Sequence, residues 1–282
     1  MYKVTSVFLA LLFVCSEMVF ADHWGKPKIN GAGPWGDNIS ASVFKGINHE
    51  MKGNGKVIVR QAGVANLIEY KGKVRAYFQW LPTKKELQLN FDHIAFMDFE
   101  SGEWSKPKVI QMPFDDKPHK YPVDPTVVEL ANGSLRMYFT TVSKKRAFIG
   151  SALSRDGVNF SIEDGKRFEV KKADIRDCAV VYFNGIWHMI SPTHKGNGKG
   201  FYGTSSDGIK FERQTDVRVK VSGDWLGNMV VKDEAVYFFG TGFVAKTQNF
   251  KEWKLLSKHR LQDPAVAYLS GDTLVLSTTN SR

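Results

Sequence analysis

One short pattern recurs along the chain and constrains its fold more than any other feature. An apolar strand, a tight polar turn and a second strand rich in aromatic residues follow one another, which is a hairpin signal. The clearest copies begin at Asp124, Asp177 and Asp263, and weaker copies begin at Val64 and Gly227. The residue numbers of successive starts differ by 60, 53, 50 and 36. Repeats of about 40–50 residues, with strands throughout, are typical of a β-propeller that has one sheet in each repeat.

The second half of each repeat has its own signature. Ser-Arg-Asp-Gly-Val-Asn-Phe at 154–160 and Ser-Asp-Gly-Ile-Lys-Phe at 206–211 are near copies, while 100–104 and 247–253 hold the same relative place. Asp-Gly supplies the positive φ angles that a tight hairpin needs, and the aromatic residue after it packs the next strand. Each repeat therefore predicts two hairpins, which form one four-stranded antiparallel blade.

The fifth repeat is incomplete, because only about two strands of ordinary length fit between Asp263 and Arg282. We expect its outer strands to come from the N-terminal side, where residues 39–44 and 56–61 fit best. Pairing strands from both sides closes the ring and leaves no open sheet edge. The sequence thus predicts an all-β fold, a five-bladed β-propeller closed by N-terminal strands.

The N-terminus has the features of a cleaved secretory signal peptide. Lys3 precedes an apolar stretch at 4–13 that is too short to span a bilayer. Val19 and Ala21 place small or short side chains at the two positions before the cleavage site that a signal peptidase recognises. We expect residues 1–21 to be removed near Ala21, leaving 22–282 as a single domain that is secreted or periplasmic. A lipoprotein anchored at Cys15 is the alternative. No other run is long and apolar enough to cross a membrane.

Composition favours a core-stabilised monomer with a basic surface. Cleavage would leave Cys178 as the only cysteine, so the fold must rely on its apolar core. The formal net charge is +10, which fits either anionic neighbours or a solvated lysine-rich surface. The lysines lie in loops without interleaved aromatic residues, so we predict no nucleic-acid partner. The 7 histidines show no ligand spacing, so we predict no metal and no other cofactor.

Candidate catalytic residues lie where the innermost strands are expected to begin. The first strand of each propeller blade lines the central channel, which would bring Asp124, Asp177 and Asp263 to one end of it. Three carboxyl groups in one funnel repel one another, so at least one should have a raised pKa, as a general acid requires. Alternatively, each aspartate only caps the loop that enters its strand.

Further side chains near the expected strand ends could bind substrate. Arg60 and Arg176 could hold a carboxylate or sulfate, or could neutralise the aspartates. Trp80 and Trp225 could stack on sugar rings, or could belong to the core. His194 could face the funnel, or could be an exposed loop residue. These candidate substrate-binding residues are Arg60, Trp80, Arg176, His194, Trp225 and Asn228.

The Asp-Pro-x-Val-Val strands with their Gly turns and Tyr-Phe strands, together with the Ser-x-Asp-Gly-x-x-Phe hairpins, resemble a known superfamily. They resemble the five-bladed propellers of the arabinanase, β-xylosidase, levansucrase and invertase glycoside hydrolases, over nearly the whole chain after residue 21. The resemblance implies a carbohydrate-active protein. It also implies an acidic base or nucleophile on blade one, a supporting Asp on blade two and a Glu as general acid on blade three.

Matched by motif, Asp124 takes the place of the supporting Asp, and Asp177 stands where the family has its general acid, with a shorter side chain. The blade-one position falls at Val64, so the expected acid is missing there. Asp263 could replace it, because blade five lies beside blade one in a closed ring. Two functions remain open. One is a glycoside hydrolase relative that acts on a neutral or anionic poly- or oligosaccharide through the funnel carboxyl groups, and the other is a non-catalytic glycan- or envelope-binding propeller.

Overall fold

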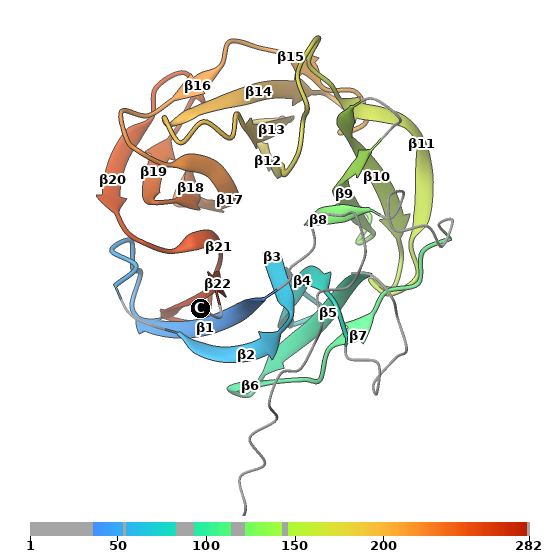
Figure 1. Ribbon diagram of the computed structural model, residues 1–282, viewed down its shortest axis with the longest axis vertical. Coiled ribbons are helices and arrows are strands. Elements are labelled where there is room, and N and C mark those ends of the chain that lie inside the picture. Colours follow the sequence, from blue (N-terminus) through green and yellow to red (C-terminus); the bar gives the residue numbers. More distant parts are fainter. Residues whose placement is uncertain (1–35, 53–54, 83–92, 114–121, 143–145, 281–282) are drawn as a thin grey trace, which may run out of the picture.

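Five antiparallel β-sheets are arranged in a ring around a central axis (Figure 1). This computed structural model describes residues 36–52, 55–82, 93–113, 122–142 and 146–280. Those residues contain no helix, and hence none that is long and apolar enough to span a membrane. The predicted five-bladed β-propeller is confirmed.

Blades one and two follow the chain outward from their innermost strands. Blade one consists of β3 (Ala62–Tyr70), β4 (Lys73–Trp80), β5 (His93–Glu100) and β6 (Glu103–Trp104), with β7 (Lys108–Val109) also paired to β5. Blade two consists of β8 (Val123–Glu129), β9 (Leu135–Val142), β10 (Ala147–Ser154) and β11 (Ser161–Phe168).

Blades three and four repeat this order. Blade three consists of β12 (Ala179–Phe183), β13 (Ile186–Pro192), β14 (Lys199–Ser205) and β15 (Glu212–Arg213), with β16 (Val217–Arg218) also paired to β14. Blade four consists of β17 (Asp224–Lys232), β18 (Ala235–Thr241), β19 (Phe243–Thr247) and β20 (Lys254–Lys258).

Blade five combines strands from opposite ends of the described chain. Its order from the channel outward is β21 (Gln262–Tyr268), β22 (Asp272–Asn280), β1 (Asp37–Lys45) and β2 (Lys56–Arg60). β1 pairs with β22 without interruption from Asp37↔Asn280 to Lys45↔Asp272. Figure 1 shows the blue and red strands side by side in this sheet. The predicted closure by two N-terminal strands is therefore confirmed.

Each pair of neighbouring blades has its own apolar core. Five clusters of buried residues fill the five interfaces; Phe78 and Leu276 belong to the one between blades one and five, and Trp225 and Phe238 to the one between blades three and four. Because the middle strands of each sheet are covered on both faces, they are apolar almost without alternation. β18 illustrates this, since every residue from Ala235 to Gly240 is buried.

The predicted Asp-Gly turns join neighbouring blades. Gly157 and Gly208 have φ angles of 73° and 71°, and the carboxylate of Asp156 accepts the N–H groups of the two residues that follow Gly157. The carbonyl of Gly157 accepts the hydroxyl of Tyr77 in blade one at 2.8 Å, and that of Gly208 accepts Tyr138 of blade two at 2.8 Å. These bonds fix adjacent blades relative to one another and so hold the inner strands in place.

Candidate functional site

The innermost strands of the blades begin at one end of the central channel, here called the funnel end. Val64, Asp124, Asp177 and Asp263 lie at these starts with φ angles of 53°, 56°, 49° and 47°. This left-handed conformation is uncommon for residues other than glycine, and for a β-branched residue such as Val64 it is a genuine outlier. The shared geometry makes the four positions structurally equivalent, in agreement with the sequence repeat.

In blades one, two and five a β-bulge lies at these positions. In blade two, Val123 pairs with Thr140 and Thr126 pairs with Tyr138, so two residues of β8 lie opposite one residue of β9. The register slips in the same way in β3 and β21. A bulge bends its strand and redirects a side chain, and the residues at these bulges line a common cavity.

Threonine hydroxyls from the preceding blade hold the strand starts. The N–H of Asp177 donates to Thr140 Oγ1 at 2.9 Å, and the N–H of Asp263 donates to Thr241 Oγ1 at 2.9 Å. The N–H of Val64 donates to Thr278 Oγ1 at 3.3 Å. Sequence reasoning missed these threonines, although the signal was present. Each lies at or within two residues of the end of the second strand of its hairpin, 15 or 16 residues after the strand start of its own blade.

In blade four the equivalent position is Leu226, whereas the sequence repeat places it at Gly227. Asn228 Oδ1 accepts the N–H of Val266 at 3.0 Å, just as Asn66 Oδ1 accepts the N–H of Val127 at 2.9 Å. The residue two positions before Asn66 is Val64, and the residue two positions before Asn228 is Leu226. Three acids and two apolar residues therefore surround the funnel end, in the blade order Val64, Asp124, Asp177, Leu226, Asp263.

Asp124 and Asp177 form a hydrogen-bonded pair of carboxyl groups. Burial raises the pKa of Asp177 well above its usual range, the charges of Asp124 and Asp263 raise it further, and the hydrogen bond with Asp124 acts in the same direction. Burial also raises the pKa of Asp124, but its hydrogen bonds with Thr140 and Asp177 and the positive charge of Arg176 oppose this rise. Asp177 is therefore the member of the pair that carries the proton, and Asp124 accepts its hydrogen bond.

Asp263 is the third acid of the cluster and its most enclosed member, with 6% of its surface exposed. Burial, followed by the charge of Asp124, raises its pKa to about 7. Its Oδ2 atom is buried without a hydrogen-bond partner. The cavity that Asp263 shares with Asp124 and Asp177 has a volume of about 10 Å³, which is room for about one water molecule.

His194 and Arg176 lie beside the pair. His194 Nε2 is 3.5 Å from Asp177 Oδ2, and 42% of the His194 side chain is exposed. Burial is the main cause that lowers the pKa of His194, and Arg176 adds to it, while the charges of Asp224 and Asp124 act in the opposite direction. The imidazole is therefore mostly neutral at pH 7, and it can exchange a hydrogen bond with the protonated Asp177.

The other sequence-predicted site residues lie elsewhere. Arg60 is exposed at the end of β2, the outermost strand of blade five. Trp80 is buried in the core between blades one and five. Trp225 borders the acidic cavity but is 1% exposed, is packed edge-on against Phe238 and donates its indole N–H to a backbone carbonyl. Its ring and the ring of Trp80 belong to the core.

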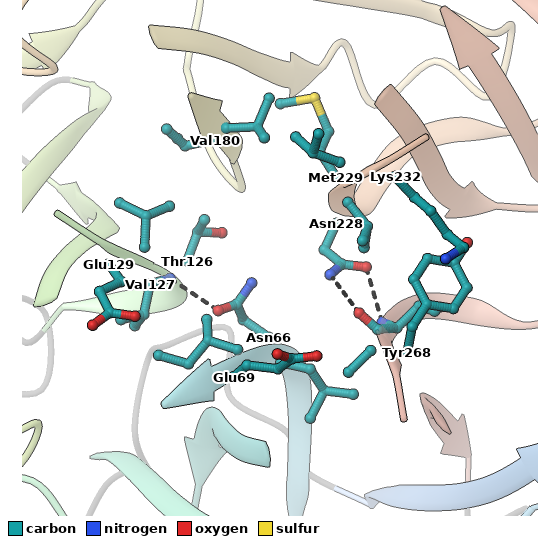
Figure 2. Close-up of a pocket in the computed structure, with 18 of the residues that line it drawn as sticks. Asn66, Glu69, Thr126, Val127, Glu129, Val180, Asn228, Met229, Lys232 and Tyr268 are labelled. Atoms are coloured by element: carbon teal, nitrogen blue, oxygen red, sulfur yellow. Dashed lines mark hydrogen bonds between the residues drawn. The ribbon is translucent and has the colours of Figure 1, made fainter. Parts of the chain in front are cut away.

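Asn228 faces the opposite end of the channel, where a larger cavity of about 730 Å³ opens. Figure 2 shows Asn66 and Asn228 deep in this cavity, each hydrogen-bonded to the backbone of the next blade. The Asn228 amide uses both its oxygen and its nitrogen in bonds to Val266, so it links blades four and five. The rim carries side chains of mixed charge, namely Glu69, Glu129, Lys232 and Tyr268.

The cluster of acids has no geometry for a metal. Within the described parts of the chain, no group of three or more His, Cys, Asp or Glu residues could hold a metal ion. Carboxyl groups with raised pKa values also compete poorly for cations, because metal ligands must be deprotonated. The arrangement is instead suited to holding and transferring a proton.

Comparison with solved structures identifies the fold. A family 117 glycoside hydrolase from Zobellia galactanivorans has a TM-score of 0.59 at 12% identity, over 88% of this chain and 92% of that one. An exo-β-1,3-galactanase from Phanerochaete chrysosporium gives 0.57 at 10% identity, over 86% and 64%. A family 43 β-xylosidase/α-arabinofuranosidase from a compost metagenome gives 0.54 at 13%, over 78% and 90%.

The chain has the five-bladed fold of these glycoside hydrolases. The resemblance seen in its motifs is thereby confirmed for the fold. Sequence identities this low show the fold alone. No family model and no curated protein matches the sequence.

Proposed function

We propose that this propeller is carbohydrate-active and acts on a poly- or oligosaccharide at the funnel end. Asp177 protonates the glycosidic oxygen, and Asp124 holds the acid through their hydrogen bond. The single observation that carries the proposal is the Asp124–Asp177 pair, in which burial and the shared hydrogen bond keep a proton on Asp177. A carboxylic acid kept neutral near pH 7 is what protonation of a leaving oxygen requires.

The second catalytic carboxyl group in this proposal is Asp263. Glycoside hydrolysis needs carboxyl groups about 5–5.5 Å apart for retention or about 6.5–9.5 Å apart for inversion. Hydrogen-bonded carboxyl groups are closer than this, so Asp124 cannot also be the base that opposes Asp177. Asp263 interacts with the pair through its charge and its pKa of about 7 suits a base that activates water near neutral pH.

A non-catalytic glycan-binding propeller is the second candidate function. It is favoured by Val64, which occupies the blade-one strand start in the strained conformation of its aspartate counterparts. The small size of the acidic cavity points the same way, since about 10 Å³ holds a water molecule and not a sugar ring. In this alternative the acids bind sugar hydroxyl groups without transferring a proton.

The two functions are separated by the variant Asp177→Asn. Asparagine keeps the shape and much of the hydrogen bonding but delivers no proton, so turnover of a panel of aryl glycosides should be lost while binding on a glycan array persists. Asp164→Asn makes the same chemical change on the exposed face of β11 and should leave both unchanged.

Each result has a defined meaning. Wild-type binding without turnover on any substrate of the panel would select the binding propeller. Turnover that survives in Asp177→Asn would remove this residue as the acid. A wild-type protein that neither cleaves nor binds any glycan would end the carbohydrate proposal itself.

Secretion and oligomeric state belong to the same proposal. Residues 1–21 lie outside the described residues, and we propose that they are a signal peptide cleaved near Ala21, which delivers a monomer to the periplasm or the medium. The N-terminal sequence of the exported protein tests the cleavage, and light scattering after gel filtration tests the monomer. An intact N-terminus on exported protein would contradict the signal peptide.

A further inference from the structure

The two ends of the propeller differ in charge. The loops and strand ends at the funnel end carry the exposed or half-buried cations Lys171, Lys172, Arg176, Lys195, Lys199, Arg218, Lys220, Lys258 and Arg260. These cations outnumber the carboxylates Glu169, Asp174, Asp216 and Asp224 of the same loops. The described turns at the opposite end carry the carboxylates Glu69, Glu100, Glu129, Asp156, Asp207, Asp233, Glu234, Glu252 and Asp272, interspersed with the cations Lys45, Lys71, Lys73, Arg155, Lys210, Lys232 and Lys251. A surface with one dominant sign of charge concentrates ligands of the opposite sign.

The acids of the funnel do not cancel this positive field near neutral pH. Asp177 has a pKa far above its usual range, and the pKa of Asp263 is raised to about 7, so much of the cluster is uncharged. Asp216 neutralises part of the basic surface, because it pairs with Lys199 at 3.0 Å and with Arg213. Lys258 and Arg260 are exposed, and neither forms an ion pair within the described residues.

A groove between blades four and five contains these two cations. Its volume is about 550 Å³, and its lining includes Lys52, Lys258 and Arg260 together with the hydroxyl-bearing residues 277–279. Gln262 lines the same groove and directly precedes Asp263. Glu50 is the one carboxylate in the lining, and it pairs with Lys52 at 2.8 Å.

We propose that the ligand of the funnel is an acidic polysaccharide, whose sulfate or carboxylate groups bind Lys258 and Arg260 in this groove while a neighbouring sugar unit faces Asp263. The inference rests on the proposed function, because it names the substrate class of the same site. Arginine binds planar or tetrahedral oxyanions through paired N–H groups. The Thr278 hydroxyl accepts the Val64 N–H and can donate its own proton to the same oxygens.

A nucleic acid fits this groove less well. Binding of single strands relies on aromatic side chains on which bases stack, and the lining contains no Phe, Tyr or Trp. Tyr182 is an exposed aromatic residue of the described chain, but it lies at the opposite end of the channel. The basic groove therefore has the hydroxyl and charge chemistry for an acidic glycan and lacks a stacking surface.

The test compares three probes by isothermal titration at low and at physiological salt: polygalacturonate, a sulfated galactan and a neutral galactan. The charged polymers should bind the full-length mature protein at least about tenfold more tightly than the neutral one, and the difference should shrink as salt screens the groove. Whether polygalacturonate or the sulfated galactan binds more tightly identifies the anionic group.

A pair of double variants locates the binding. Lys258→Gln with Arg260→Gln should weaken binding of the charged polymers by about tenfold and leave the neutral galactan unchanged. Lys210→Gln with Lys251→Gln removes the same charge from turns at the opposite end and should have no effect on either. Thermal melting of both double variants shows whether the fold is intact.

The possible failures are distinguishable. If the neutral galactan binds as tightly as the charged polymers, or if both double variants weaken binding equally, the groove is not the anionic site, although the proposed function stands. If duplex DNA or single-stranded DNA competes for the groove more strongly than the glycans, the acidic-polysaccharide inference is overturned. If no glycan binds at all, the proposed function fails together with this inference.

Discussion

Thr140 of blade two holds Asp177 of blade three in position. Its hydroxyl oxygen accepts the Asp177 N–H at 2.9 Å, and the same hydroxyl is a hydrogen-bond partner of the Asp124 carboxyl group. One side chain thus fixes the backbone of the proposed acid and lowers the pKa of its neighbour. The relative protonation of the two acids thus depends on a buried residue that does not line the acidic cavity itself.

Replacing Thr140 with valine should therefore disturb both acids. Valine keeps the shape and removes the hydroxyl, which leaves the buried N–H of Asp177 without a partner at a cost of about 1–3 kcal/mol. We expect a lower urea midpoint and a shifted pH profile of turnover, or of glycan binding if there is no turnover.

The matched control for this change is Thr241→Val, which removes the equivalent bond to Asp263. It should lower stability by a similar amount but shift a different limb of the pH profile. Equal pH profiles in the two variants would show that Thr140 is only structural.

The strained start of β3 can be relieved. Val64 has a φ angle of 53°, a conformation that costs a β-branched residue about 1–3 kcal/mol and that asparagine tolerates. Val64→Asn should therefore stabilise the fold by about 1 kcal/mol in urea unfolding. Val231→Asn, at an exposed valine in a strand, serves as the control and should give no gain. A Val64→Asn variant less stable than the wild type would mean that packing outweighs the strain.

The contribution of Asp263 to stability should fall as the pH rises through the neutral range. The folded protein binds a proton on Asp263 up to a pKa of about 7, whereas the unfolded chain releases it near pH 4. Between these values Asp263 holds more protons in the folded state, so its own contribution to the free energy of unfolding decreases with pH, by a total on the order of a few kcal/mol. Urea unfolding from pH 4.5 to pH 8.5, chosen as about the limits of this window, measures the effect.

Asp263→Asn is the variant that checks the origin of this pH dependence. It should flatten the curve and make the protein more stable than the wild type above about pH 7, because an amide carries no charge to bury. Burial lowers the pKa values of His49, His188, His194 and His259, and this makes stability rise with pH below about pH 6.5 in both proteins. The check is therefore the difference between the two curves, and a stability advantage of Asp263→Asn that does not grow from about pH 5 to about pH 8.5 would contradict the buried, protonated state of Asp263.

Removing the N-terminal strands should prevent folding. Deletion of residues 22–61 takes away β1 and β2 and exposes the edge of β22, which then offers unpaired backbone groups for aggregation. We expect an insoluble or molten chain by near-ultraviolet circular dichroism. A peptide of residues 36–61 supplied during refolding should restore structure, and a scrambled peptide should not. A truncated chain that unfolds cooperatively with unchanged stability would refute the closure.

The repeat and its closure could be predicted because they depend on local chemistry. Alternating turn and strand signals predict the blades. Because the C-terminal residues supply only two strands of blade five, the two missing strands had to be β1 and β2. Asp124, Asp177 and Asp263 could be grouped for the same reason, since equivalent residues of a repeat meet at one end of the ring. Arg176 and His194 followed from their closeness in sequence to these strands.

The rest depended on contacts between blades, which no local pattern encodes. The bulge in β17 moves the strand start to Leu226, because side-chain bonds between Asn228 and Val266 decide the register. Trp225 was expected at strand ends, but whether its ring faces sugar or core is set by Phe238 of the adjoining strand. The hydrogen bonds of Thr140, Thr241 and Thr278 could not be predicted from the local sequence, because the N–H groups that they accept lie in the following blade.

The pairing of β1 with β22 has a kinetic consequence. Ser40 and Thr279, which share a side-chain hydrogen bond, are 239 residues apart in sequence. At about 5–20 residues per second of synthesis, the first strands wait on the order of ten seconds or more before their partners exist. Contacts this distant in sequence also slow the folding step itself. The ring can therefore close only after the last strand has been made.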